Sequence, residues 1–224
     1  MNSILLAQSI KRDVLTKTGS LKILDGVTLQ LGEGESVAIQ GASGSGKSTL
    51  LGVLAGLDLP QQGSVFIEGY DITLLDEDQR ALVRANKVGF VFQSFHLIDD
   101  LTALENVALP LELFGHSHAF AESEDCLKSL GLADRIGHFP RQLSGGEQQR
   151  VALCRAFAIK PRILFADEPT ANLDTSTAEI VLEQLFSLQS EFNTSMVVAT
   201  HDSALARRCD RILRIESGKL ITEA

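Results

Sequence analysis

The sequence predicts an α/β fold, in which a mostly parallel central sheet carries an antiparallel β flank and an inserted helical lobe. Four short aliphatic runs, each ending in glycine or in polar residues, indicate the parallel strands, and they are residues 36–40, 88–92, 163–166 and 196–199. Uninterrupted apolar runs are typical of strands that are buried on both faces. Because α/β proteins bind ligands at the carboxyl ends of their strands, the polar residues after these runs are the first candidates for a site.

The flank is predicted by a different pattern. Residues 1–35 and 63–72 alternate between apolar and polar positions and are rich in turn residues, which favours antiparallel strands. A long helix is predicted at 175–191. The residues expected on its inner side are Ile180, Leu182, Leu185 and Leu188.

The lobe is predicted between about 94 and 142, where the β pattern disappears. Residues 119–130 have helical spacing, and Pro110 and Pro140 interrupt the segment. We interpret the segment as a mostly helical lobe that is inserted in the α/β core.

Composition restricts the function classes. The 224 residues are 44% hydrophobic and 22% charged, which is ordinary for one globular domain. With 20 basic and 29 acidic side chains the formal charge is −9, which argues against a domain held on nucleic acid by its phosphates. Cys126, Cys154 and Cys209 lie far apart and read as reduced thiols. No signal peptide and no apolar run long enough to span a bilayer is visible, so we expect a soluble, cytoplasmic chain.

A glycine-rich loop follows the first predicted strand and opens a helix. It fits the pattern GxxxxGK[ST], with the residues Gly41, Ala42, Ser43, Gly44, Ser45, Gly46, Lys47, Ser48 and Thr49. Its backbone N–H groups can surround phosphate oxygens, and the helix N-terminus adds partial positive charge. Lys47 is the cation for the phosphates, and Ser48 offers its hydroxyl to Mg²⁺. The loop therefore predicts binding of a nucleoside triphosphate.

An acid pair follows the strand at 163–166. Asp167 is the candidate Mg²⁺ ligand, and Glu168 is the candidate group that orients and polarises the attacking water. This pair predicts phosphoryl transfer to water.

A second anion site is predicted at the start of a helix. Its residues are Leu143, Ser144, Gly145, Gly146 and Glu147. Ser144 and Glu147 form a capping box. The two glycines disfavour a helix, yet they allow another group to approach its first turn closely. One phosphate loop together with a separate anion site suggests sites that are shared between two copies of the chain.

The run LSGGEQQR from Leu143 resembles the signature sequence of ATP-binding cassette (ABC) ATPases. The other motifs of that family follow in order: Gln93 resembles the Q-loop glutamine, residues 171–174, ending in Asp174, resemble the D-loop, and His201 resembles the switch histidine. The resemblance covers essentially the whole chain, so residues 1–224 are expected to form one nucleotide-binding domain with a P-loop NTPase core.

The resemblance also implies a mechanism. Two chains are expected to form a homodimer around two ATP–Mg²⁺, with the signature residues of one chain on the γ-phosphate bound by the other. In this scheme Gln93 is a further Mg²⁺ ligand, and Glu168, His201 and Gln93 are the catalytic residues.

Within the family, the stretches 87–98, 101–107, 143–155 and 206–211 are similar to ATP-binding subunits of the LolD/MacB/YbbA group. This implies a dimer on separate permease subunits that have few spans and a large extracytoplasmic domain, at the cytoplasmic face of the inner membrane. The activity implied is export, extrusion or lipoprotein release, with residues 93–113 as the docking surface.

Three alternatives stay open. An FtsE-like ATPase would signal across the membrane without moving a substrate, and an uptake ATPase would serve a polar nutrient. A soluble ABC ATPase of DNA repair or translation fits less well, because such chains usually hold two cassettes or coiled-coil insertions.

One departure concerns the nucleotide base. ABC ATPases usually carry an adenine-stacking aromatic residue on an early loop, whereas residues 11–18 contain no tyrosine or phenylalanine. Stacking of a base on an aromatic ring contributes about 1–3 kcal/mol in other settings. We therefore expect weaker nucleotide affinity or looser base selectivity.

Overall fold

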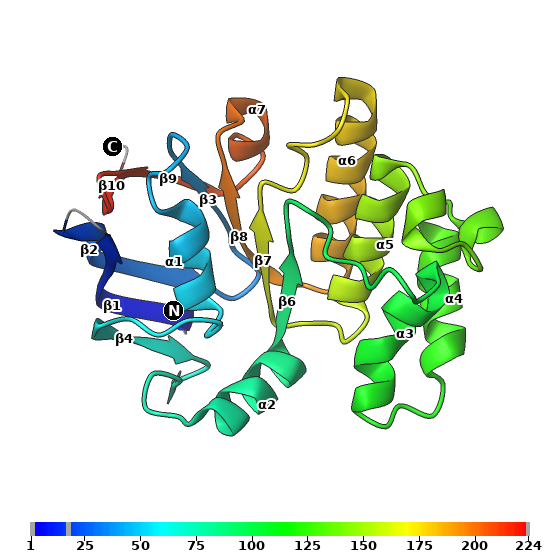
Figure 1. Ribbon diagram of the computed structural model, residues 1–224, viewed down its shortest axis with the longest axis horizontal. Helices are drawn as coiled ribbons and strands as arrows, with labels where there is room; N and C mark the ends of the chain where they lie inside the picture. Colours follow the sequence, from blue (N-terminus) through cyan, green and yellow to red (C-terminus); the bar gives the residue numbers. More distant parts are fainter. Residues whose placement is uncertain (1–2, 17–18, 223–224) are drawn as a thin grey trace.

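The computed structural model describes residues 3–16 and 19–222, which form two sheets with helices packed around them (Figure 1). The larger sheet has six strands in the order β10-β9-β3-β8-β7-β6. The strands of this sheet are β3 (Ser36–Gln40), β6 (Val88–Val91), β7 (Ile163–Asp167), β8 (Ser195–Thr200), β9 (Arg211–Glu216) and β10 (Lys219–Thr222). The five strands from β9 to β6 are parallel, and β10 is antiparallel to β9. The mostly parallel sheet is confirmed.

The smaller sheet is antiparallel and forms the predicted flank. Its strands, in the order β2-β1-β4-β5, are β1 (Ser3–Thr16), β2 (Gly19–Gly32), β4 (Gln62–Ile67) and β5 (Tyr70–Asp71). The helix α1 (Lys47–Leu54) contacts both β2 of this sheet and β7 and β8 of the larger one. It therefore begins where the two sheets meet.

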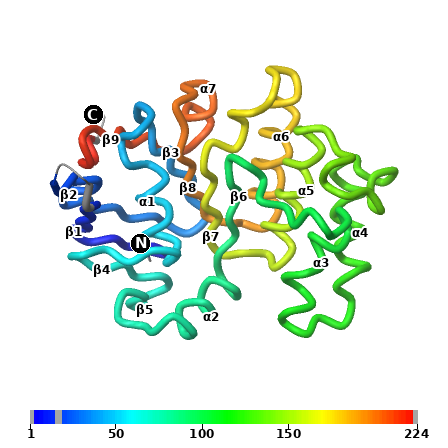
Figure 2. Tube along the Cα trace, viewed as in Figure 1, coloured from blue at the N-terminus to red at the C-terminus, as the bar shows by residue number. Residues whose placement is uncertain are grey.

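Residues 94–142, all of which are described, contain helices and 3₁₀ turns and no strand. These are α3 (Ala103–Leu113), α4 (Ala119–Ser129), η1 (Ala133–Arg135) and η2 (Pro140–Gln142). Figure 2 shows α3 and α4 side by side at the end of the molecule away from the N-terminal strands. Pro140 begins η2, but Pro110 lies inside α3 and does not end it.

The larger sheet is buried on both faces, as its uninterrupted apolar strands predict. In β7, Phe165 packs toward α1 and the smaller sheet, whereas Leu164 and Ala166 pack toward α5 (Gly145–Phe157) and α6 (Thr175–Glu191). All three side chains are fully buried.

The helix α6 has the predicted bounds, but one predicted inner residue is wrong. Ile180 is 47% exposed, and Val181 takes the inner position together with Leu185 and Leu188. Successive residues of a helix are rotated by about 100° around its axis. Positions 181, 185 and 188 therefore lie on one face of α6, whereas Ile180 lies on a neighbouring face that is exposed.

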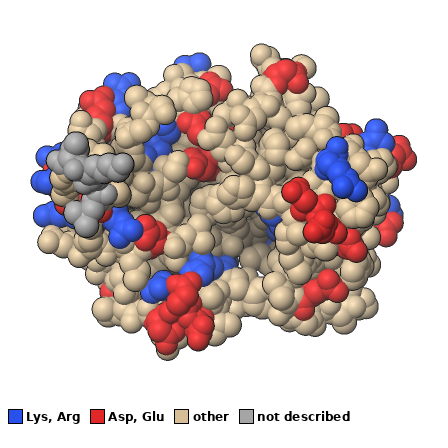
Figure 3. Space-filling model, in the orientation of Figure 1, with Lys and Arg blue, Asp and Glu red and all other residues tan. Residues whose placement is uncertain are grey.

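Two helices were not predicted from the pattern. The helix α2 (Glu77–Lys87) begins at a capping box formed by Asp76 and Gln79, and the short α7 (Ser203–Ala206) begins at Asp202. On the face shown in Figure 3, acidic side chains gather over α2 beside basic ones.

Candidate active site

The glycine-rich loop joins β3 to α1 and presents the open N-terminus of that helix. Gly46 precedes the helix with φ 102°, and a Cβ there would lie 2.8 Å from the Ile23 carbonyl oxygen, so only glycine fits. No side chain caps the first turn of α1. Its first N–H groups thus have no intrahelical or side-chain partner at this helix end and can bind an anion.

Lys47 brings a nearly buried positive charge into this loop. Its side chain is 7% exposed, and Nζ donates to the carbonyl oxygens of Gly41 at 2.8 Å and Ala42 at 3.2 Å. Nζ also lies 3.5 Å from Oε1 of Glu168. A buried ammonium needs acceptors or a negative charge beside it, and the loop carbonyls and the carboxylate supply both.

Glu168 connects two of the predicted residues. Its second carboxylate oxygen, Oε2, lies 2.9 Å from Nδ1 of His201, and the carboxylate is only 12% exposed. The Glu168 backbone has φ 46°, a left-handed conformation that is uncommon outside glycine. Such backbone strain persists only where the surroundings enforce it, and it is concentrated at functional sites.

Asp167 has the environment of a cation ligand. Burial raises the pKa of its carboxyl, a hydrogen bond from the Ser48 hydroxyl opposes this rise, and the neighbouring Glu168 charge adds to it. Within the described residues, Oδ1 of Asp167 is buried without a hydrogen-bond partner. Carboxylate and hydroxyl oxygens are hard ligands that suit Mg²⁺, so the residues present fit this ion.

Lys47, Ser48, Glu168 and His201 line one cavity of about 520 Å³, whereas the adjacent Asp167 is not among its described lining residues. Its lining consists of Ile23, Ser43, Gly44, Gly46, Lys47, Ser48, Thr49, Gln93, Glu168 and His201. Gly41, Ala42 and Ser45 line an adjoining hollow that shares Ser43, Gly44 and His201 with it. The structure thus brings together the phosphate loop, Gln93, Glu168 and His201, although Gln93 lies two residues beyond the end of β6 and not directly at it.

Ile23 was missed from the sequence. It is one of several aliphatic residues in the long strand β2, and no local pattern separates it from the residues that serve the core.

The signature residues begin α5 and do not line this cavity. Leu143 is buried, and Ser144 and Glu147 form the predicted capping box, in which the hydrogen bond from the Ser144 backbone lowers the pKa of Glu147. The two glycines differ. A Cβ on Gly146 would lie 2.2 Å from Cγ2 of Thr177, whereas a Cβ on Gly145 would meet no atom closer than 3.5 Å. The expectation that both glycines admit an outside group is therefore corrected for Gly146, which α6 approaches in the same chain.

Asp174 also lies outside the cavity lining. It caps α6, and its carboxylate accepts hydrogen bonds from the hydroxyls of Ser176 and Thr177, each at 2.6 Å. These bonds hold the pKa of Asp174 far below its usual range. Three residues upstream of α6, Asn172 donates to the carbonyl oxygen of Gln93 at 3.0 Å and so ties this segment to the cavity.

Comparison with known proteins identifies the family. Residues 24–171 match the family model described as ABC transporter. The chain belongs to this family. It is 50% identical to the ABC transporter ATP-binding protein YbbA of Escherichia coli K12, over 99% of this chain and 98% of that protein. It is 46% identical to the lipoprotein-releasing system ATP-binding protein LolD of Xanthomonas axonopodis pv. citri, over 94% of this chain and 89% of that protein.

Solved structures support the same assignment. A dimeric structure of the ATP-binding cassette MJ0796 bound to ADP and Pi superposes with a TM-score of 0.91, at 40% identity over 98% of this chain and 97% of that one. This ABC ATPase therefore has the predicted fold, and its resemblance to the LolD/MacB/YbbA group is confirmed for YbbA and LolD. Within the described residues, no helix is long and apolar enough to cross a membrane.

Among the described residues, the lining of the cavity includes the aliphatic Ile23 and no phenylalanine, tyrosine or tryptophan. Ile23 lines the cavity, while Asp13 borders a separate hollow and accepts a hydrogen bond from Ser20. The segment 11–18 contains no tyrosine or phenylalanine, and its residues 17 and 18 lie outside the described residues.

We therefore predict weak discrimination between bases. Because an aliphatic side chain offers no ring for stacking or for base-specific hydrogen bonds, the dissociation constants for ATP and GTP should differ by less than about tenfold. Equilibrium binding of each nucleotide measures this, and Lys47→Ala, which should lose both, verifies that binding occurs at this site. Tight ATP binding with clear rejection of GTP would contradict the prediction.

Proposed function

We propose that two copies of this chain, each a single nucleotide-binding domain with a helical lobe at residues 94–142, close head to tail around two ATP molecules. The observation that carries the proposal is the split of the site. Lys47, Glu168 and His201 meet at one cavity, whereas the α5 N-terminus, which Ser144 caps, lies outside its lining and has room for a further contact at Gly145. A second copy in reverse orientation would place Ser144 and Gly145 opposite the γ-phosphate. Two dimeric structures of one relative, MJ0796, support the formation of a dimer.

The chemistry follows from the contacts of Glu168. His201 and Lys47 hold its two carboxylate oxygens, so the carboxylate has a defined orientation. In the proposed step Glu168 orients a water molecule and accepts its proton, the water oxygen bonds to the γ-phosphorus, and the bond to the leaving ADP oxygen breaks. Lys47 and the N–H groups of α1 stabilise the charge on the phosphate oxygens.

Asp167 and Ser48 are the residues that would hold Mg²⁺, with Gln93 at the same cavity as a further ligand. The bound ion would neutralise phosphate charge during transfer.

Replacing Glu168 by glutamine tests the proposal. The variant keeps the size of the side chain but cannot accept the proton, so hydrolysis should fall at least about 100-fold and an ATP-bound dimer should accumulate. Light scattering after gel filtration in millimolar ATP measures the dimer. Glu183→Gln, which removes an exposed carboxylate from α6, is the matched control and should behave as the parent chain. A monomeric Glu168→Gln variant, with and without its membrane partner, would overturn the dimer proposal.

The two signature glycines provide a second test. Gly146→Ala should destabilise the fold by about 1–3 kcal/mol, because its Cβ overlaps Thr177. Gly145→Ala should leave stability within about 1 kcal/mol, because its own chain has room for the methyl group. When Gly145→Ala is combined with Glu168→Gln, however, it should abolish the ATP-dependent dimer, because the added methyl group would lie in the proposed contact with the second copy. Urea unfolding and gel filtration separate the two effects, and a normal dimer for Gly145→Ala would contradict the proposed contact.

We further propose that the dimer is bound to permease subunits at the cytoplasmic face of the inner membrane and drives export, extrusion or lipoprotein release. The similarity to LolD, whose name describes a lipoprotein-releasing system, supports this class of activity. FtsE-like signalling and nutrient uptake are the alternatives. The membrane partner distinguishes them: export, extrusion or lipoprotein release needs a subunit with few spans and a large extracytoplasmic domain, and uptake needs a compact permease with many spans. FtsE-like signalling differs from transport in the identity of that partner.

A groove beside the site provides a docking surface for such a subunit. It holds about 330 Å³, is almost wholly apolar, and is lined by Ala55, Leu57, Ala81, Arg84, Ala85, Val88, Phe90 and Phe92. It extends the predicted docking segment 93–113 toward α2. An apolar groove beside the cavity fits an amphipathic helix of a permease better than a polar ligand.

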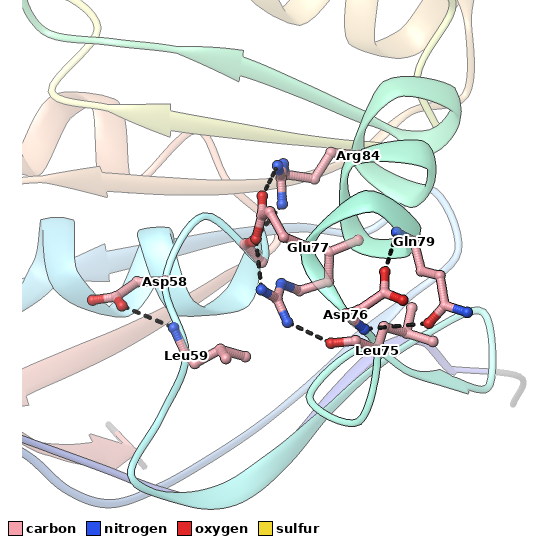
Figure 4. A network of polar contacts seen from close by, with 9 residues as sticks. Asp58, Leu59, Leu75, Asp76, Glu77, Gln79 and Arg84 are labelled. Atoms are coloured by element: carbon pink, nitrogen blue, oxygen red, sulfur yellow. Dashed lines mark hydrogen bonds and ion pairs between the residues drawn. The ribbon is translucent and has the colours of Figure 1, made fainter.

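Polar contacts hold the α2 wall of this groove in place (Figure 4). Glu77 accepts from Arg80 at 2.5 Å and from Arg84 at 2.7 Å, and Arg84 also donates to the Gly56 carbonyl oxygen at 2.7 Å. The contact with Gly56 joins α2 to the turn after α1, and residues of both segments line the groove.

Leu57→Asp tests the docking surface. Leu57 is 50% exposed in the groove, so a charge there should reduce recovery of the membrane subunit about tenfold or more while basal ATP hydrolysis is kept. Co-purification from gently solubilised membranes and mass spectrometry measure the loss and identify the subunit. Ile180→Asp, 47% exposed on α6, is the matched control. Equal recovery with both variants would exclude the groove, and recovery of no membrane protein with the parent chain would exclude the transporter assignment.

A further inference from the structure

The segment that follows Gln93 has a strained backbone conformation. Phe95 and His96 are consecutive non-glycine residues with left-handed φ angles of 60° and 49°. Such residues occur singly and require enforcement by their surroundings. Local hydrogen bonds are present, since the N–H of Phe95 donates to Phe92 and that of His96 to Ser94. However, these bonds lie within the turn and do not position it against the rest of the molecule.

Arg155 supplies a contact from outside the turn. From α5, its Nη2 donates to the Phe95 carbonyl oxygen at 2.7 Å and its Nη1 to the His96 carbonyl oxygen at 2.5 Å. One planar guanidinium thus holds both left-handed residues through two donors of fixed spacing. Burial lowers the pKa of Arg155, and the two carbonyl dipoles replace part of the water that it loses.

The same helix carries the signature at its other end. Arg155 lies ten residues after Gly145, about 15 Å along α5. A Cβ on Gly145 would lie 3.8 Å from the Phe95 ring, and the His96 ring packs against Phe92 of the apolar groove with centroids 4.5 Å apart. The turn after Gln93 is therefore in contact with both ends of α5 and with the groove.

We propose that Arg155 is a positioning residue, which sets the backbone after Gln93 relative to the helix that begins at Gly145. This inference rests on the proposed dimer, in which Gln93 faces one ATP and Gly145 the other. Arg155 then makes the two half-sites of one chain move as a unit when the dimer closes.

Arg155→Gln in the Glu168→Gln background tests this. The ATP concentration for half-maximal dimer formation should rise about tenfold or more, since two hydrogen bonds from a charged donor are lost. Nucleotide binding to the monomer, which depends mainly on the phosphate loop, should change less than about threefold. Arg155→Lys should restore the dimer only in part, because an ammonium can donate to two carbonyl oxygens, as Lys47 does, but lacks the fixed donor spacing of the guanidinium. Arg141→Gln, an exposed arginine on η2, is the matched control.

Rescue by glycine distinguishes positioning from a general loss of stability. Glycine adopts left-handed φ without strain, so adding His96→Gly to Arg155→Gln should recover most of the dimer formation, with His96→Gly alone close to the parent. If Arg155→Gln behaves like Arg141→Gln, or if it is impaired and glycine gives no recovery, the positioning role is wrong.

Hydrogen exchange of the backbone at residues 93–98 gives a readout that does not need a dimer. In Arg155→Gln monomers this segment should exchange at least about tenfold faster, and unchanged exchange would overturn the inference. Failure of the parent Glu168→Gln chain to dimerise would instead count against the proposed function alone, since the exchange experiment still decides the role of Arg155.

Discussion

The site depends on one nearly buried charge pair, Lys47 with Glu168. Neither group could be buried at this depth alone, because an unpaired charge would lose its hydration without compensation. Lys47 satisfies its remaining donors on loop carbonyls, and Glu168 satisfies its other oxygen on His201. These contacts together hold the Lys47 ammonium 3.5 Å from Oε1 of Glu168.

The sheet order makes this pair possible. Lys47 follows β3, His201 follows β8, Glu168 follows β7 and Gln93 follows β6, and these four strands are consecutive neighbours in the larger sheet. Because they are parallel, all four carboxyl ends lie at one edge. Residues that are more than 150 positions apart in the chain thus meet without any long loop to bring them together.

Much of the site could be predicted from the sequence because its signals are local. The capping box of Ser144 and Glu147 needs only four residues, and the phosphate loop needs nine. The sequence could not predict features that depend on packing between distant segments. Ile23 lines the cavity only because β2 passes beside the loop, and Gly146 is constrained by Thr177, thirty-one positions away. The helix α2 was missed although its own capping box was readable. Of its described residues only Arg80 is buried, so the helix has no stripe of buried apolar residues at helical spacing.

The acid pair places two carboxylates side by side in a partly buried position. Asp167 is adjacent to Glu168, its Oδ1 lacks a partner, and burial together with the Glu168 charge raises its pKa. A carboxyl whose folded pKa is raised is less favourable in its ionised form in the folded chain than in the unfolded one, so it destabilises the fold once the pH exceeds its unfolded pKa. A cation held by Asp167 and Ser48 would supply a partner for Oδ1 of Asp167 and would reduce the repulsion between the two carboxylates.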